Sequence, residues 1–163
     1  MLKKYLIVFL ISMIPLIELR GAVPIGLSNA FGDVLPVIPL YIVCIIGNML
    51  PVPIIFFFAR KVLEWGANKK FIGKFFTFCL EKGEKGGKKL QEKAGRGLYF
   101  ALFLFVGIPL PGTGAWTGTL AASLLDMDFK KSIIAVMAGV VLAGIIMGLA
   151  SAGVFGAIGA ILK

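Results

Sequence analysis

The chain has 163 residues, of which 59% are hydrophobic and 15% are charged, and its formal net charge is +9. Soluble domains contain about 45–50% apolar and about 25% charged residues, so one water-soluble core of this size cannot hide all of this apolar surface. The composition excludes an ordinary soluble domain, and the long apolar runs favour membrane helices over the alternating strands of an outer-membrane barrel.

Residues 5–31 form the first apolar segment, and its centre is broken by prolines and charges. Pro15, Glu18, Arg20 and Pro24 leave two short apolar arms, and arms of about 10–14 residues are typical of re-entrant elements. Broken backbone at membrane depth must be buried in protein or line a watery cavity. We therefore expect a helical hairpin that dips into the membrane and returns. A kinked helix that spans the membrane is the alternative.

Residues 34–59 form an uncharged apolar segment, and about 20 such residues suffice to cross the bilayer. We expect a transmembrane helix here, kinked by its prolines. Asn48 is a lone amide within this segment. Such an amide more often forms a helix–helix hydrogen bond than a ligand contact, but it is kept as a candidate for substrate or ion binding.

Residues 60–96 hold most of the lysines and arginines of the chain. Between apolar segments, such a cluster indicates a cytoplasmic connection rather than a nucleic-acid site. Within it, residues 62–80 mix aromatic and basic side chains, which predicts an amphipathic helix lying at the membrane interface. Membrane lipid is therefore an expected partner, and nucleic acid is not.

Residues 98–125 form a second broken segment, and residues 132–162 form a second uncharged span. The triplet Ile14-Pro15-Leu16 in the first broken segment matches Ile108-Pro109-Leu110 in the second, and each triplet opens a run of small residues. The order of broken segment and spanning helix thus occurs twice, as a weak internal repeat of the kind that many transporters contain.

These elements predict an all-α integral membrane protein with one multi-pass domain, residues 1–163, in the cytoplasmic membrane. Residues 1–59 and 97–163 would be two inverted repeats, each a re-entrant hairpin followed by a transmembrane helix, joined by the interfacial helix. This topology leaves Lys3 and Lys4 outside, against the positive-inside bias. A first segment that spans fully is therefore kept as the alternative.

Glu18 and Arg20 are the first candidate constellation. An ionisable residue at the centre of a membrane helix costs about 2.5–3.5 kcal/mol or more, so its presence favours a function. Glu18 could carry a proton or bind a cation, and Arg20 could hold a phosphate or carboxylate. The alternatives are that the two side chains neutralise each other as a structural pair, or that both lie at the membrane interface.

The second constellation is the sharp turn in the second broken segment. Free amides at the start of the following helix attract anions, and hydroxyl and indole groups lie beside them. A tight hairpin tip, in which small residues serve packing alone, explains the same pattern. The candidate binding residues here are Pro111, Gly112, Thr113, Gly114, Trp116 and Thr117.

Small residues repeat at a spacing of four in the last apolar segment. Such a ladder lets two helices approach closely, and here it predicts packing on residues 34–59 or across a homodimer. The residues of this ladder are Gly144, Gly148, Ala152 and Gly156.

The sequence contains no histidine, so no Ser/His/Asp or Cys/His set can form. Cys44 and Cys79 suggest neither a disulfide framework nor a metal site, and we expect both to pack as small apolar residues. The sequence therefore predicts no catalytic residue, metal or cofactor.

Glu18-Leu-Arg-Gly-Ala-Val-Pro-Ile-Gly26 and Gly107-Ile-Pro-Leu-Pro-Gly-Thr-Gly-Ala-Trp116 resemble the two signature segments of the small multidrug export protein family. The architecture more distantly resembles the DedA family, whose re-entrant hairpins face each other and whose members are implicated in lipid-carrier and proton-coupled transport. By this resemblance, Glu18 and Arg20 belong to the first hairpin, and Pro111, Gly112 and Thr113 to the tip of the second.

Three functional hypotheses follow. The first is a small secondary transporter that exports a small, cationic and hydrophobic substrate, with proton coupling at Glu18 and a second protomer covering the hairpin tips. The second is a DedA-like lipid-carrier flippase or scramblase. The third is a membrane scaffold without transport activity, with the basic connection as its docking surface.

Overall fold

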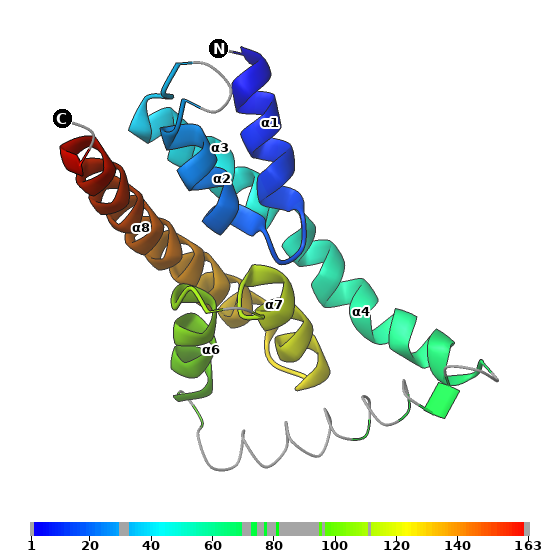
Figure 1. Cartoon of the computed structure of the whole chain (residues 1–163). Helices are drawn as coiled ribbons and strands as arrows, with labels where there is room; N and C mark the ends of the chain where they lie inside the picture. Colours follow the sequence, from blue (N-terminus) through cyan, green and yellow to red (C-terminus); the bar gives the residue numbers. More distant parts are fainter. Residues whose placement is uncertain are drawn as a thin grey trace.

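The computed structural model describes residues 2–29, 33–69, 97–110 and 112–161, together with residues 73, 74, 77, 81 and 95, and describes side chains as far as Gly153. Within these ranges the chain is helical and contains no strand. Figure 1 shows two helical hairpins set against two long helical segments. Part of the interfacial helix predicted for residues 62–80, namely residues 70–72, 75, 76 and 78–80 with Cys79 among them, lies outside the described residues.

The first hairpin consists of α1 (Leu2–Met13) and α2 (Glu18–Leu27). Its open end is held together by Lys4, a buried lysine whose ammonium donates hydrogen bonds of 2.7 Å to the carbonyl oxygens of both Ser28 and Asp33. A cation suits this place, because the last carbonyls of a helix carry partial negative charge. The start of α1 and the end of α2 therefore lie side by side.

The second hairpin consists of α6 (Gly97–Gly107) and α7 (Ala115–Leu124). Its tip reverses the chain through positive φ angles at Gly112 and Gly114, which side chains with a Cβ rarely adopt. The glycines predicted to form a sharp turn therefore do so. In Figure 1 the tips of the two hairpins meet near the middle of the molecule, and their open ends point away from each other.

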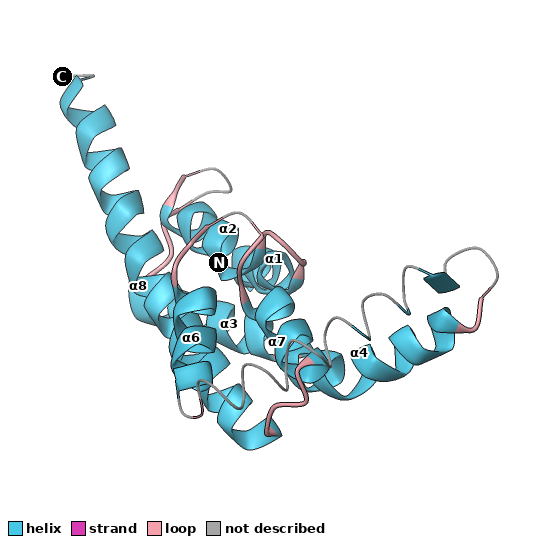
Figure 2. Ribbon diagram, turned by 90° about the horizontal axis from the view of Figure 1, so that it is seen from below, coloured by secondary structure: helices cyan, strands magenta, loops and turns pink. Residues whose placement is uncertain are grey.

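Two helical segments, Val37–Ala67 and Phe129–Gly153, are long and apolar enough to cross a membrane. The first consists of α3 (Val37–Met49) and α4 (Pro51–Ala67), separated at Leu50. The break lies where proline lacks the N–H that continues a helix. Residues 60–67, which we expected to begin the connection, instead extend α4, and Figure 2 shows this end projecting from the other helices.

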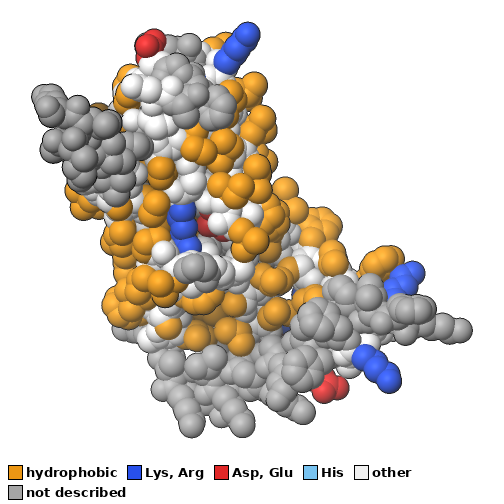
Figure 3. All heavy atoms as spheres, in the orientation of Figure 1, with side chains coloured by type: hydrophobic (Ala, Val, Ile, Leu, Met, Phe, Trp, Pro, Cys, Tyr) orange, Lys and Arg blue, Asp and Glu red, His pale blue; other side chains and the backbone are white. Residues whose placement is uncertain are grey.

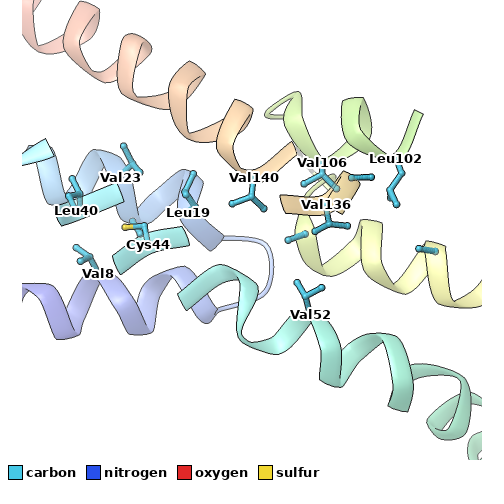
Figure 4. Close-up of a cluster of buried hydrophobic side chains, with 14 of the residues drawn as sticks. Val8, Leu19, Val23, Leu40, Cys44, Val52, Leu102, Val106, Val136 and Val140 are labelled. Carbon is cyan, nitrogen blue, oxygen red and sulfur yellow. The ribbon is translucent and has the colours of Figure 1, made fainter. Parts of the chain in front are cut away.

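The second long segment belongs to α8 (Phe129–Ile161). Each long segment packs against both hairpins: α3 lies against α1 and α2 while α4 lies along α7, and α8 contacts α6, α7 and α2. The buried apolar side chains form one cluster between them, which Figure 4 follows from Val8, Leu40 and Cys44 to Val136 and Val106. Cys44 is thus a buried packing residue, as predicted.

The hydrogen bonds of Lys4 predict that both ends of the first hairpin lie on the same side of the membrane. Lys3 and Asn29 lie at the two ends of the first hairpin and both are exposed. We expect Lys3→Cys and Asn29→Cys to react with an impermeant thiol reagent from the same side of the membrane, because the hairpin returns to the side where it starts. Labelling of intact and of inverted vesicles measures this. Reaction from opposite sides would show that residues 5–31 span.

Candidate site at the junction of the hairpins

The carboxylate of Glu18 binds the first backbone amides of α7. Glu18 is the first residue of α2 and is 3% exposed. Its Oε2 accepts a hydrogen bond of 3.1 Å from the Ala115 amide, and its Oε1 accepts one of 3.0 Å from the Trp116 amide. The first amides of a helix have no partner within the helix and carry partial positive charge. Glu18 is therefore an N-cap supplied by the other hairpin.

The guanidinium of Arg20 binds backbone carbonyls at the end of α6 and just after it. It donates hydrogen bonds of 3.0 Å to the carbonyl of Val106, 3.3 Å to that of Ile108 and 2.7 Å to that of Leu110. The last carbonyls of a helix also lack partners within the helix, and the planar guanidinium has enough donors to bind several of them. The two charged residues of α2 thus satisfy opposite ends of one break in the second hairpin.

Each of the two charges is hydrogen-bonded to backbone groups of the second hairpin. Among the described residues no ion pair joins Glu18 to Arg20, and Glu18 is buried rather than exposed. In Figure 3 basic and acidic side chains meet in the middle of a face that is otherwise largely hydrophobic. The charges therefore join the two hairpins through backbone groups.

The backbone at the junction is strained on one side and tightly packed on the other. Leu16 and Glu18 have φ angles of 73° and 51°, a left-handed conformation that costs a residue with a Cβ about 1–2 kcal/mol. Across the junction, Gly114 has a φ of 139°, and a Cβ there would overlap both carboxylate oxygens of Glu18. The carboxylate reaches the α7 amides because this position is glycine.

The other predicted tip residues are held locally. The Thr113 hydroxyl lies 2.9 Å from the carbonyls of both Ile108 and Leu110, and the Thr117 hydroxyl donates to the Gly114 carbonyl at 3.4 Å. Both hydroxyls therefore bind backbone carbonyls within the tip of the second hairpin and stabilise its turn. Pro111 lies outside the described residues.

Pro24 and Asn48 lie on α2 and α3. Pro24 is inside α2, where it lacks the amide that would otherwise bind the Arg20 carbonyl. Asn48 is 2% exposed, and its Oδ1 has no hydrogen-bond partner.

The small-residue ladder packs against a tyrosine. The Tyr41 hydroxyl, on α3, donates a hydrogen bond of 2.7 Å to the Gly144 carbonyl, and a Cβ at Gly148 would overlap that hydroxyl. Ala152 is exposed, and the surroundings of Gly156 lie outside the described residues. Sequence reasoning did not single out Tyr41, because an aromatic residue in an apolar run has no distinguishing pattern.

An open groove of about 630 Å³ lies between the tip of the first hairpin, α4 and α7. Its walls are apolar and include Leu16, Ile54, Phe58 and Trp116. Trp116 connects the groove to the junction, because it lines the groove while its backbone amide binds Glu18. The indole Nε1 is buried without a hydrogen-bond partner.

Comparison with known proteins identifies one family. Residues 18–146 match the model of a family described as "Putative small multi-drug export protein". This match confirms the resemblance drawn from the two signature segments, both of which lie within it. No curated protein and no solved structure matches the chain.

The close contact between Gly114 and Glu18 predicts that an alanine at position 114 destabilises the protein, and Gly112 offers a comparison position. Gly114 and Gly112 both have positive φ angles, but only a Cβ at Gly114 meets other atoms. Gly112→Ala should therefore show only a backbone cost, whereas Gly114→Ala should show the larger backbone cost of its extended positive-φ conformation and in addition displace the carboxylate. We expect a larger fall in thermal-unfolding temperature in detergent for Gly114→Ala. Equal falls would show that the carboxylate contact contributes nothing.

Proposed function

We propose, for a chain that belongs to the small multi-drug export protein family, that it is a small secondary transporter of the cytoplasmic membrane. It exports a small, hydrophobic and cationic substrate in exchange for protons, and Glu18 carries the proton. The observation on which this proposal depends is the binding of Glu18 and Arg20 to the two broken ends of the second hairpin.

The junction supports transport because its bonds can be exchanged. Transporters form their sites where helices are broken near the middle of the membrane, with helix ends directed at charged groups. Here charged side chains of the first hairpin bind backbone groups of the second. Protonation of Glu18 removes its charge and so weakens its hydrogen bonds to the α7 amides. The start of α7 can then move away from α2 without unfolding either hairpin.

The hairpins enter the membrane from opposite sides in this proposal, and α3–α4 and α8 cross it. The contact between the two tips and the opposite directions of their open ends support this arrangement. The two halves are then inverted repeats, and rocking of one against the other exposes the junction to each side in turn. Arg20 remains bound to the carbonyls of α6 as a fixed point.

The groove supports the choice of substrate. Its walls are apolar, so they favour a hydrophobic molecule, and the aromatic rings of Phe58 and Trp116 attract cations. The Glu18 carboxylate accepts a hydrogen bond from the amide of Trp116, which lines this groove. A cation in the groove therefore competes with the α7 amides for the negative charge of Glu18.

A second copy of the chain completes the site. Leu16 and Leu110, at the two tips, are 72% and 56% exposed, and irregular backbone at membrane depth is not tolerated against lipid. In the proposed homodimer the partner covers the tips and closes the open side of the groove.

Glu18→Gln tests the role of the carboxylate. The amide keeps the size of the side chain but loses the charge and the proton carrier. A hydrogen bond to a charged group is worth about 1.5–3 kcal/mol, so we expect pH-gradient-driven uptake of tetraphenylphosphonium into inverted proteoliposomes to fall about tenfold or more.

The matched control is Glu64→Gln, which removes an exposed carboxylate on the projecting end of α4. It should leave uptake unchanged. Uptake by Glu18→Gln equal to wild type would contradict proton carriage by Glu18. Wild-type protein that moves labelled anionic lipid but no tetraphenylphosphonium would favour the flippase, and failure to move either would favour the scaffold.

Leu16→Cys tests the homodimer. Oxidation in membranes should give a disulfide-linked dimer if the tips of two copies meet. Leu149→Cys, on α8, is the control because Leu149 is 71% exposed but lies away from the tips. Gel electrophoresis without reductant measures the products. Equal cross-linking at both positions would indicate random collision rather than a specific interface.

A further inference from the structure

A second open groove, of about 470 Å³, lies between α6 and the first turns of α8. Its walls consist of two residues of α6 and four of α8, namely Tyr99, Phe103, Lys131, Ile134, Ala135 and Ala138. Among the described residues it shares none with the groove beside Trp116. Ligand sites have volumes of about 300–1,000 Å³, so this groove has room for a ligand of its own.

The two helices that form this groove run in parallel. Near their starts, the Lys131 ammonium lies over the ring of Tyr99. Further along both helices, a Cβ at Gly139 would press against Val106. Later residues of α6 thus meet later residues of α8, and Figure 1 shows the two helices side by side. From Lys131 to Ala138 the groove follows about 10 Å of the α8 axis.

The groove changes from polar to apolar along this length. Lys131 and Tyr99 supply an ammonium and a phenol hydroxyl at its start, and the side chains that follow are those of Phe103, Ile134 and Ala138. The lysines at the start of α8 predict that this end faces the cytoplasm, by the positive-inside bias. The polar end then lies among lipid headgroups, and the apolar end lies among acyl chains.

The polar end of the groove is suited to an anion. The Lys131 ammonium lies 5.7 Å from the centroid of the Tyr99 ring, within the range of cation–π attraction, and pairs with no carboxylate among the described residues. The Tyr99 hydroxyl accepts a hydrogen bond of 3.2 Å from the Asp128 amide, so its own hydrogen can be donated. The Asp128 carboxylate instead binds the Lys131 amide at 2.9 Å.

We infer that this groove binds one anionic phospholipid of the cytoplasmic leaflet. Its phosphate lies at Lys131 and Tyr99, and one acyl chain lies along Phe103 and Ala138. Basic pockets between membrane helices bind anionic headgroups in this way. A soluble phosphate would leave the apolar end of the groove empty, and a zwitterionic lipid brings an ammonium of its own that competes with Lys131. The lipid bridges α6 and α8 whether or not the protein transports a substrate.

Lys131→Gln tests the site, because it removes the charge from an exposed residue that needs no repacking. Native mass spectrometry of the detergent-purified protein measures the binding of phosphatidylglycerol and of phosphatidylcholine. We expect wild type to prefer phosphatidylglycerol. The variant should bind phosphatidylglycerol about fivefold more weakly, the usual contribution of one basic residue at an anionic surface. Its unchanged binding of phosphatidylcholine would show that the groove is intact.

Lys130→Gln is the matched control, since it removes the same charge from the neighbouring exposed residue, which is not among those that line the groove. It should bind phosphatidylglycerol like wild type. Equal losses in the two lysine variants would show attraction by the general positive charge and overturn the site. Wild type without a preference for phosphatidylglycerol, or Lys131→Gln without a loss, would overturn it as well.

Two further measurements test the acyl chain. Ala138→Phe narrows the apolar end without changing the charge, so it should weaken the binding of phosphatidylglycerol. Glycerol 3-phosphate carries the phosphate without acyl chains, and we expect it not to displace the bound lipid at equal concentration. Displacement by glycerol 3-phosphate would indicate a site for a soluble anion and overturn the assignment to a lipid. Unchanged binding in Ala138→Phe would overturn the position of the chain.

Discussion

The hydrogen bonds from Glu18 and Arg20 to the broken second hairpin are the contacts on which the rest of the structure depends. Hydrocarbon offers no partner for a free amide or carbonyl, so a helix that stops inside the bilayer needs its ends satisfied by protein. One turn of α2 supplies a negative charge for the start of α7 and a positive charge for the end of α6. The cost of burying each charge is offset by a helix end of opposite polarity.

In the proposed transporter, the same contacts give Glu18 and Arg20 a structural and a functional role together. An ion pair between Glu18 and Arg20 alone would not link the first hairpin to the second. Because the two side chains instead bind the backbone of the second hairpin, the charge of Glu18 affects the position of that hairpin. The groove is linked to this junction by Trp116, which lines the groove and whose amide binds Glu18. In the proposed transport cycle, a cation in the groove and a proton therefore act on the same carboxylate.

Much of this arrangement was predictable from the sequence. Pro15, Pro109 and the tip glycines mark where apolar segments break, and the cost of burying Glu18 and Arg20 marks them as candidates. Their partners were not predictable, because the amides and carbonyls that they bind are about ninety residues away and every residue has such groups. The first long helix continues to Ala67, past the charged residues at which we expected the connection to begin, because long basic side chains can extend from a helix into water.

The interruption at Leu50 has a mechanical consequence. It separates α3, which packs on the first hairpin, from α4, which packs on α7. Pro51 and Pro53 have no amide hydrogen to lose, so bending at this level breaks fewer hydrogen bonds than bending elsewhere in the same helix. The α8 helix is continuous beside it. One long helix can thus serve as a hinge while the other acts as a rigid strut.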